Sequence, residues 1–152
     1  PTPTPTPNPT PTPTANPTPT SPELLQMLNQ RISDEYRSLS AYARVLADFP
    51  GQKPFSNIVE AEAQHISAVS KLFDNRGLAV PASPYFIDAM AGFGTLTAAC
   101  SAAADAESVS YKMYDAFLAK LGGEPADVVN VFMSLRDDSR DRHFPAFSTC
   151  AK

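Results

Sequence analysis

Apolar residues recur at the spacing of an α-helix in four segments of the chain, and each segment is predicted to form a helix. In the first segment the apolar positions are Leu24, Leu28, Ile32, Leu39, Tyr42 and Leu46. Just before them, Ser21-Pro22-Glu23 supplies a capping serine, a proline suited to the first turn and an acidic residue at the positive end of a helix. Pro50-Gly51 predicts that this helix ends near Asp48.

Proline and glycine mark the boundaries of the other three predicted helices. The second should span about 54–77, the third about 95–121, and the fourth should begin at Glu124-Pro125 and end near Pro145. Residues 78–94 contain two prolines and two glycines, so they should form an irregular crossover with one short turn. No stretch alternates apolar and polar residues for long enough to predict a sheet.

The lengths of the connections predict how the four helices are arranged. Short turns join the first helix to the second and the third to the fourth, so each pair should form an antiparallel hairpin. A long crossover between the two hairpins distinguishes this arrangement from a simple up-and-down bundle. The predicted fold class is therefore all-α, with one bundle domain over residues 23–152.

Residues 1–22 have a different composition and are predicted to be a separate Pro/Thr-rich tail. They hold ten of the 16 prolines and no charged residue. Alternating proline and threonine favours polyproline II, and Thr/Pro-rich segments are typical of O-glycosylated stalks in exported proteins. The tail is either a disordered linker or a segment that packs on a neighbouring copy and builds a homo-oligomer or polymer. The candidate glycosylation sites are Thr2, Thr4, Thr6, Thr10, Thr12, Thr14, Thr18 and Thr20.

Charge and hydropathy narrow the function classes. The formal net charge of −4 argues against a nucleic-acid partner, and no apolar run is long enough to predict a membrane span. The chain carries no recognisable signal peptide, and a start such as PTPTPTPNPT suggests an exported protein whose signal has been removed. We therefore expect an extracellular or cell-surface location.

Five residues that can bind a metal fall inside the apolar stripes of the predicted helices. They are Glu35 in the first helix, Glu62 and His65 in the second, Glu107 in the third and His143 in the fourth. A glutamate and a histidine three residues apart lie on one face of a helix and can share a metal. Buried carboxylates that converge without a cation would repel one another and cost several kcal/mol each.

The register of the second hairpin supports this convergence. In an antiparallel pair, residues that face each other have a roughly constant sum of residue numbers. Glu107 and His143 have the same sum as Cys100 and Cys150, the only two cysteines. The two cysteines are therefore predicted to form a disulfide, which would indicate an oxidising compartment, or else to be two independent thiols.

The segment 55–65 and the run 139–147 resemble the second and last helices of an uncharacterised bacterial and archaeal ferritin-like family, a domain of unknown function in the ferritin superfamily. The resemblance covers about residues 24–148 and omits the tail. It implies a ferritin-like antiparallel four-helix bundle with a long crossover between the second and third helices. It also implies that the superfamily's metal ligands correspond to Glu35, Glu62, His65, Glu107 and His143.

One position departs from the superfamily pattern, which has a second Glu-x-x-His in the last helix. Arg140 stands where that glutamate is expected, and arginine cannot bind a metal. In an α-helix, Asp138 and Asp141 should point about 100° or more away from this position. One divalent ion together with Arg140 would balance the three glutamates. We therefore expect one iron, manganese or zinc ion with Arg140 as the second cation, or no metal with Arg140 pairing the carboxylates.

Two functions follow from these observations. The first is an exported ferritin-like metal-binding domain that is displayed or self-associates through its tail, with no oxidase activity firmly implied. The second is a structural subunit of an extracellular assembly or filament, in which the metal site is vestigial or only stabilising. The alternative for the site itself is that the glutamates are ordinary edge residues of amphipathic helices. The tyrosines at 36, 42, 111 and 114 are expected to pack in the core or at its boundary.

Overall fold

The structure is a computed structural model that describes residues 20–152. Its helices are α1 Pro22–Asp48, α2 Phe55–Asp74, the 3₁₀ turn η1 Ile87–Ala89, α3 Leu96–Leu121, α4 Ala126–Asp138, the π turn η2 Ser139–His143 and α5 Phe144–Cys150. The assembly predicted for the tail and the threonines at 2–18 lie outside the described residues. The predicted cap of the first helix is confirmed, because the Ser21 hydroxyl accepts a hydrogen bond from the Leu24 N–H.

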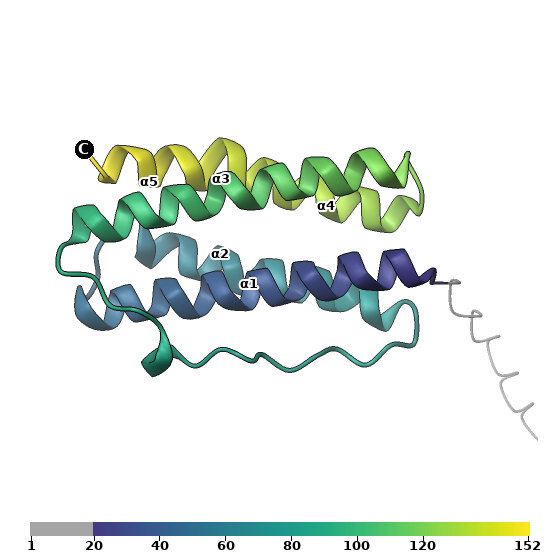
Figure 1. Ribbon diagram of the computed structural model, residues 1–152, viewed down its shortest axis with the longest axis horizontal. Helices are drawn as coiled ribbons and strands as arrows, with labels where there is room; N and C mark the ends of the chain where they lie inside the picture. Colours follow the sequence, from purple (N-terminus) through teal and green to yellow (C-terminus); the bar gives the residue numbers. More distant parts are fainter. Residues whose placement is uncertain (1–19) are drawn as a thin grey trace, which may run out of the picture.

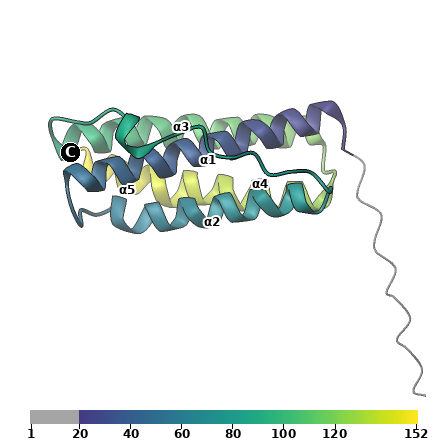
Figure 2. The same ribbon diagram turned by 90° about the horizontal axis from the view of Figure 1, so that it is seen from below.

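The described residues form an all-α bundle without strands (Figure 1). Helices α1 and α2 form one antiparallel hairpin, and α3 forms a second with the continuous run of α4, η2 and α5 (Figures 1 and 2). Between α2 and α3 the chain runs back along the whole bundle beside α1 and includes the short turn η1 (Figure 1). The predicted long crossover is therefore present. None of the helices in the described part is long and apolar enough to cross a membrane.

Two hydrophobic clusters form the core, one toward each end of the bundle. The first contains the N-terminal part of α1 with Val69, Phe117 and Phe132 from the other helices. The second contains Phe55, Ala103 and Phe147 at the opposite end. The buried polar residues of the candidate site come from segments of the helices between these two clusters. Apolar packing on both sides therefore fixes the helices that carry the site.

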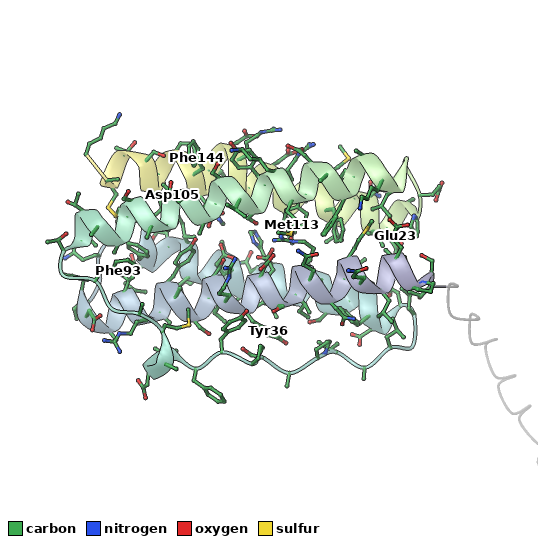
Figure 3. All side chains as sticks on the ribbon, viewed as in Figure 1. Glu23, Tyr36, Phe93, Asp105, Met113 and Phe144 are labelled. Carbon is green, nitrogen blue, oxygen red and sulfur yellow. A yellow bond between two sulfur atoms is a disulfide. The ribbon has the colours of Figure 1, made fainter. Side chains whose placement is uncertain are left out.

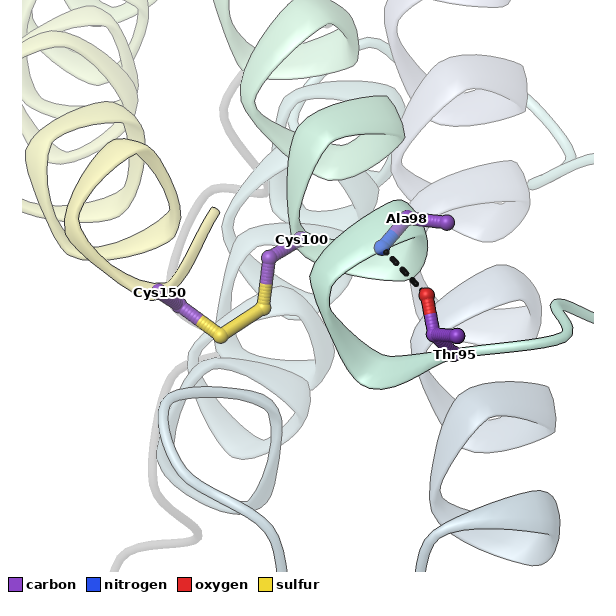
Figure 4. Close-up of a disulfide and its surroundings, with 4 residues drawn as sticks. All are labelled: Thr95, Ala98, Cys100 and Cys150. Carbon is purple, nitrogen blue, oxygen red and sulfur yellow. Dashed lines mark hydrogen bonds between the residues drawn. A yellow bond between two sulfur atoms is a disulfide. The ribbon is translucent and has the colours of Figure 1, made fainter. Parts of the chain in front are cut away.

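A disulfide joins the start of α3 to the last helix of the chain (Figure 4). Cys100 and Cys150 have Cα atoms 5.7 Å apart, as the predicted register requires. Close to Cys100, the Thr95 hydroxyl accepts a hydrogen bond from the Ala98 N–H and caps the N-terminus of α3 (Figure 4). The disulfide holds this end of the second hairpin together, and the cap stabilises the start of α3.

The prediction that the fourth helix ends near Pro145 is wrong. The helix continues to Cys150 through the π turn Ser139–His143, where the Phe144 N–H donates to the Ser139 carbonyl five residues earlier. A proline ring in a regular helix collides with the carbonyl four residues before it, and a wider turn removes that collision. Pro145 is therefore accommodated in the first turn of α5.

Candidate metal centre

The structure brings all five predicted ligands together in the middle of the bundle. Each is at most 4% exposed, so the site contains three buried glutamates and two buried histidines. Their side chains form two triads within which the ligand atoms lie less than 4.8 Å apart. The first triad is Glu35, Glu62 and His65, and the second triad is Glu62, Glu107 and His143. Glu62 belongs to both.

In the first triad, a hydrogen bond already joins two of the three side chains. His65 Nδ1 lies 3.2 Å from Glu35 Oε2, within hydrogen-bond geometry, and 3.7 Å from Glu62 Oε2. The other ring nitrogen, Nε2, is buried without a hydrogen-bond partner, 3.5 Å from Asp138 Oδ2. His65 therefore faces the carboxylates through Nδ1.

In the second triad, one histidine nitrogen lies close to two carboxylates but has hydrogen-bond geometry with neither. His143 Nδ1 lies 3.1 Å from Glu62 Oε1 and 3.5 Å from Glu107 Oε1. Despite these short distances, Nδ1 is buried and makes no hydrogen bond of acceptable geometry. The three groups thus converge on a common point, which is the arrangement that ligands of a shared cation require.

Two tyrosines bind the outer glutamates in a reciprocal way. The Tyr42 hydroxyl on α1 donates to Glu107 Oε1 on α3 at 2.6 Å. The Tyr114 hydroxyl on α3 donates to Glu35 Oε1 on α1, also at 2.6 Å. The core position predicted for these two tyrosines is correct, but each also orients a carboxylate of the candidate site.

Arg31 is a fully buried cation beside the first triad. Its Nη2 donates to Glu35 Oε1 and to Ser110 Oγ, both at 2.9 Å, and the guanidinium lies 3.9 Å from the centre of the Tyr114 ring. Nη1 donates to Asp34 at 3.1 Å and contacts the Met113 sulfur, which lies between α1 and α3 (Figure 3). The Glu35 carboxylate is thus paired with a permanent positive charge.

These contacts change the pKa values of the buried histidines and glutamates. Burial alone would lower the pKa of both histidines, but the carboxylates of Glu35 and Glu62 raise the pKa of His65 to about 10. In the same way, Glu107 and Glu62 raise the pKa of His143 to about 9. Burial raises the pKa of Glu62 to about 6, whereas contacts with His65 and Arg31 outweigh burial at Glu35 and hold its pKa well below the usual range.

The predicted role of Arg140 as the second cation is wrong. Its side chain is 41% exposed and pairs with Asp137 and Asp141, not with the buried glutamates. The cause is the π turn, whose extra residue changes which side chains face inward. Asp138, predicted to point away, instead places Oδ2 3.5 Å from His65 Nε2 and Oδ1 3.1 Å from the Arg142 guanidinium.

A pocket of about 310 Å³ leads to the site between α2 and η2. Both histidines line it, and Asn57, Gln64 and Arg142 line its outer part. The two imidazole rings are stacked with their centres 5.4 Å apart. The histidine side of the site is therefore the side nearest to solvent.

Comparison with known proteins supports the fold alone. No family model matches the sequence, and neither does any curated protein. The fold is similar to the crystal structure of the hypothetical protein MJ0754 from Methanococcus jannaschii DSM 2661, with a TM-score of 0.75 and 21% identity. The match covers 88% of this chain and 82% of that chain. At this level of identity, the similarity establishes a shared fold alone.

Sequence reasoning missed two residues of the site. Arg31 carries a signal, because Leu24, Leu28, Arg31 and Glu35 follow one another at steps of three and four on a single face of α1. A charge at such a position should have a buried partner. Asp138 carries no comparable signal, since its position depends on a π turn that regular helical spacing does not predict.

Proposed function

We propose that this chain is an exported ferritin-like domain that binds one divalent metal ion at Glu62, Glu107 and His143. The proposal is carried by the convergence of these three buried side chains, with His143 Nδ1 close to both carboxylates but hydrogen-bonded to neither. The order of the helices, the long crossover and the contribution of ligands from several helices agree with a ferritin-like bundle.

The second triad is a better metal site than the first because of Arg31. Arg31 and Tyr114 both donate to Glu35 Oε1, and His65 bonds to Oε2, so this carboxylate is already satisfied. Glu107 has the Tyr42 hydroxyl as its donor and no buried guanidinium beside it. A bound cation would therefore stabilise the carboxylates of the second triad more than those of the first.

Charge balance also favours a single ion. Three ionised glutamates and Arg31 leave two net negative charges, which two protonated histidines neutralise in the metal-free protein. One divalent ion that displaces the proton of His143, the only histidine among its proposed ligands, leaves one excess positive charge. Two divalent ions would leave the cluster with two excess positive charges. We therefore expect metal binding to release protons, as ligation by neutral histidine requires.

A bound ion would supply Lewis acidity and, for iron or manganese, redox chemistry. Glu62, Glu107 and His143 would hold it, while Tyr42 orients Glu107 through its 2.6 Å hydrogen bond. The pocket between α2 and η2 gives solvent, protons and small polar molecules a route to the histidine side of the site. The apolar clusters on both sides of the site exclude water from the rest of it.

The test is a metal titration of the purified protein after removal of metal with a chelator. With Zn²⁺ or Mn²⁺ we expect one ion per chain, and calorimetry in buffers of different ionisation enthalpy should show release of protons. Glu107→Gln should abolish binding. Asp105→Asn, an exposed carboxylate on the same helix, is the matched control and should bind normally. Full binding by Glu107→Gln would refute the proposed site.

A structural role is the second candidate, and one observation favours it. With both histidines protonated the buried cluster is electrically neutral without metal, and the disulfide already fixes one end of the bundle. In this version the bundle is a building block that is displayed or assembled through its tail, and the cluster is an ion-pair network. If an excess of Zn²⁺ or Mn²⁺ leaves the melting temperature of the metal-free protein unchanged, this candidate gains support.

A further inference from the structure

The two hairpins contain a repeated glutamate–tyrosine pair. On α1 Tyr42 follows Glu35 by seven residues, and on α3 Tyr114 follows Glu107 by the same spacing. Each tyrosine bonds to the glutamate of the other helix, which makes the two pairs reciprocal. The two triads, which share Glu62, are therefore approximately equivalent halves of one site.

The two halves differ at the position one helical turn before each glutamate. Arg31 precedes Glu35 by four residues, and Ala103 precedes Glu107 by four residues. Arg31 fills its half with a guanidinium that contacts Glu35, Ser110 and Asp34. Ala103 brings no charge to its half; it borders an apolar cavity of about 80 Å³ that Tyr42 also lines and that no residue of the second triad lines.

We propose that Arg31 is the residue that sets the metal content of this site, by closing the first triad so that only the second triad takes an ion. This inference rests on the proposed metal-binding function. It assigns Arg31 a role as a built-in cation at the half-site of Glu35, Glu62 and His65.

The environment of Arg31 makes it a fixed charge and not a mobile side chain. The guanidinium has donors engaged with three oxygen partners, contacts the Met113 sulfur and lies on the Tyr114 ring. A bound ion cannot displace it without leaving these buried groups unpaired. An ion at the first triad would also lie next to a like charge in a low-dielectric interior.

Removal of this charge should open a second metal site in the same chain. Without Arg31, the excess positive charge that two divalent ions would leave over the three glutamates falls from two to one, and the Asp138 carboxylate can balance the remainder. Asp138 is already 3.5 Å from His65 Nε2, so the fourth carboxylate is close to the cluster. Arg31→Met keeps an unbranched side chain of similar length beside Met113 and removes only the cation and its donors.

The experiment counts Mn²⁺ per chain and records its electron paramagnetic resonance spectrum. Wild type should bind one ion with the spectrum of an isolated Mn²⁺. Arg31→Met should bind two ions with the altered spectrum of a coupled pair, because Glu62 is shared. Arg31→Lys, which keeps the positive charge, should remain at one ion.

The reciprocal variant tests the same idea if Arg31→Met does not fold. Ala103→Arg places a guanidinium beside Glu107 and should reduce binding from one ion to none, whereas the uncharged control Ala103→Leu should keep one ion. One ion in Arg31→Met or in Ala103→Arg overturns the inference while the proposed function stands. Two ions in wild type also overturn it. No ion in wild type refutes the proposed function instead.

Discussion

Both hairpins of the bundle place a glutamate–tyrosine pair at a common centre. They differ in how the negative charge of that glutamate is compensated. The first hairpin places the buried Arg31 next to Glu35, so that half of the cluster is neutralised by the protein itself. The second hairpin has Ala103 at the corresponding position and leaves Glu107 to Tyr42 and His143. The repeated scaffold therefore contains one half that Arg31 already neutralises and one half that we propose as the metal site.

The largest expected effect is a pH dependence of stability that is steeper without metal. The pKa values of His65 and His143 are raised to about 10 and about 9, so their protonated forms stabilise the fold fully below pH 6.5. As the pH rises toward 9, the folded state retains protons that the unfolded state has lost. Stability should then fall by about 2.7 kcal/mol per pH unit for the pair.

This effect is measured by chemical denaturation of the metal-free protein between pH 6 and pH 10. The metal-loaded protein should show about half this slope, because the metal has displaced the proton of His143 while His65 keeps its own. A flat profile without metal would mean that the histidines are not paired with the carboxylates. The comparison of the two hairpins would then lose its electrostatic basis.

Loss of the disulfide should have the next largest effect and should act on the second hairpin alone. The bond between Cys100 and Cys150 spans 50 residues, and loop-entropy arithmetic for that length gives a stabilisation of about 4 kcal/mol. The paired variant Cys100→Ala/Cys150→Ala should lower the free energy of unfolding by about that amount. Metal stoichiometry should be unchanged, because neither cysteine contacts a proposed ligand.

Removal of the hydroxyl group from Tyr42 or from Tyr114 should lower metal affinity to different extents. Tyr42→Phe removes the hydrogen bond that orients Glu107 and should weaken metal binding by roughly 10–100-fold. Tyr114→Phe removes an equivalent bond to Glu35, but Arg31 still holds that carboxylate, so affinity should change much less. Each variant should cost about 1.5–3 kcal/mol of stability. Equal losses of affinity would show that both halves bind metal.

The smallest effect is expected at Arg140. Its side chain is partly exposed and pairs with neighbouring aspartates, so Arg140→Ala should change stability by no more than about 0.5 kcal/mol. Metal stoichiometry should remain at one. A second ion in Arg140→Ala would restore the cation role that the sequence pattern suggested for this residue.

Sequence reasoning identified the helices and the ligand set because both depend on regular helical spacing. The register that aligns Glu107 with His143 also aligned Cys100 with Cys150, and the structure places the cysteines within bonding distance. It failed where the helix is not regular. The π turn at Ser139–His143 moves Arg140 outward and Asp138 toward His65, and a pattern based on 3.6 residues per turn cannot predict this.

Arg31 was missed for a different reason. Its spacing from Leu28 and Glu35 is regular, but a lone arginine beside an apolar stripe is usually a surface residue whose stem lies along the core. Burial of the whole guanidinium depends on Ser110 and Tyr114, which belong to a helix about 80 residues away in the sequence. Such a partnership becomes apparent only once α1 and α3 are placed side by side.

The polar layer between the two hydrophobic clusters has a consequence for cooperativity. Each helix pair is held by one apolar cluster at each end, and the layer between them contributes little hydrophobic burial. Without a metal the ends should open as separate units, the end with the disulfide last, with amide protons that exchange at two distinct rates. A metal that binds ligands from three helices at once would link the two units, so the exchange rates should converge when it is added.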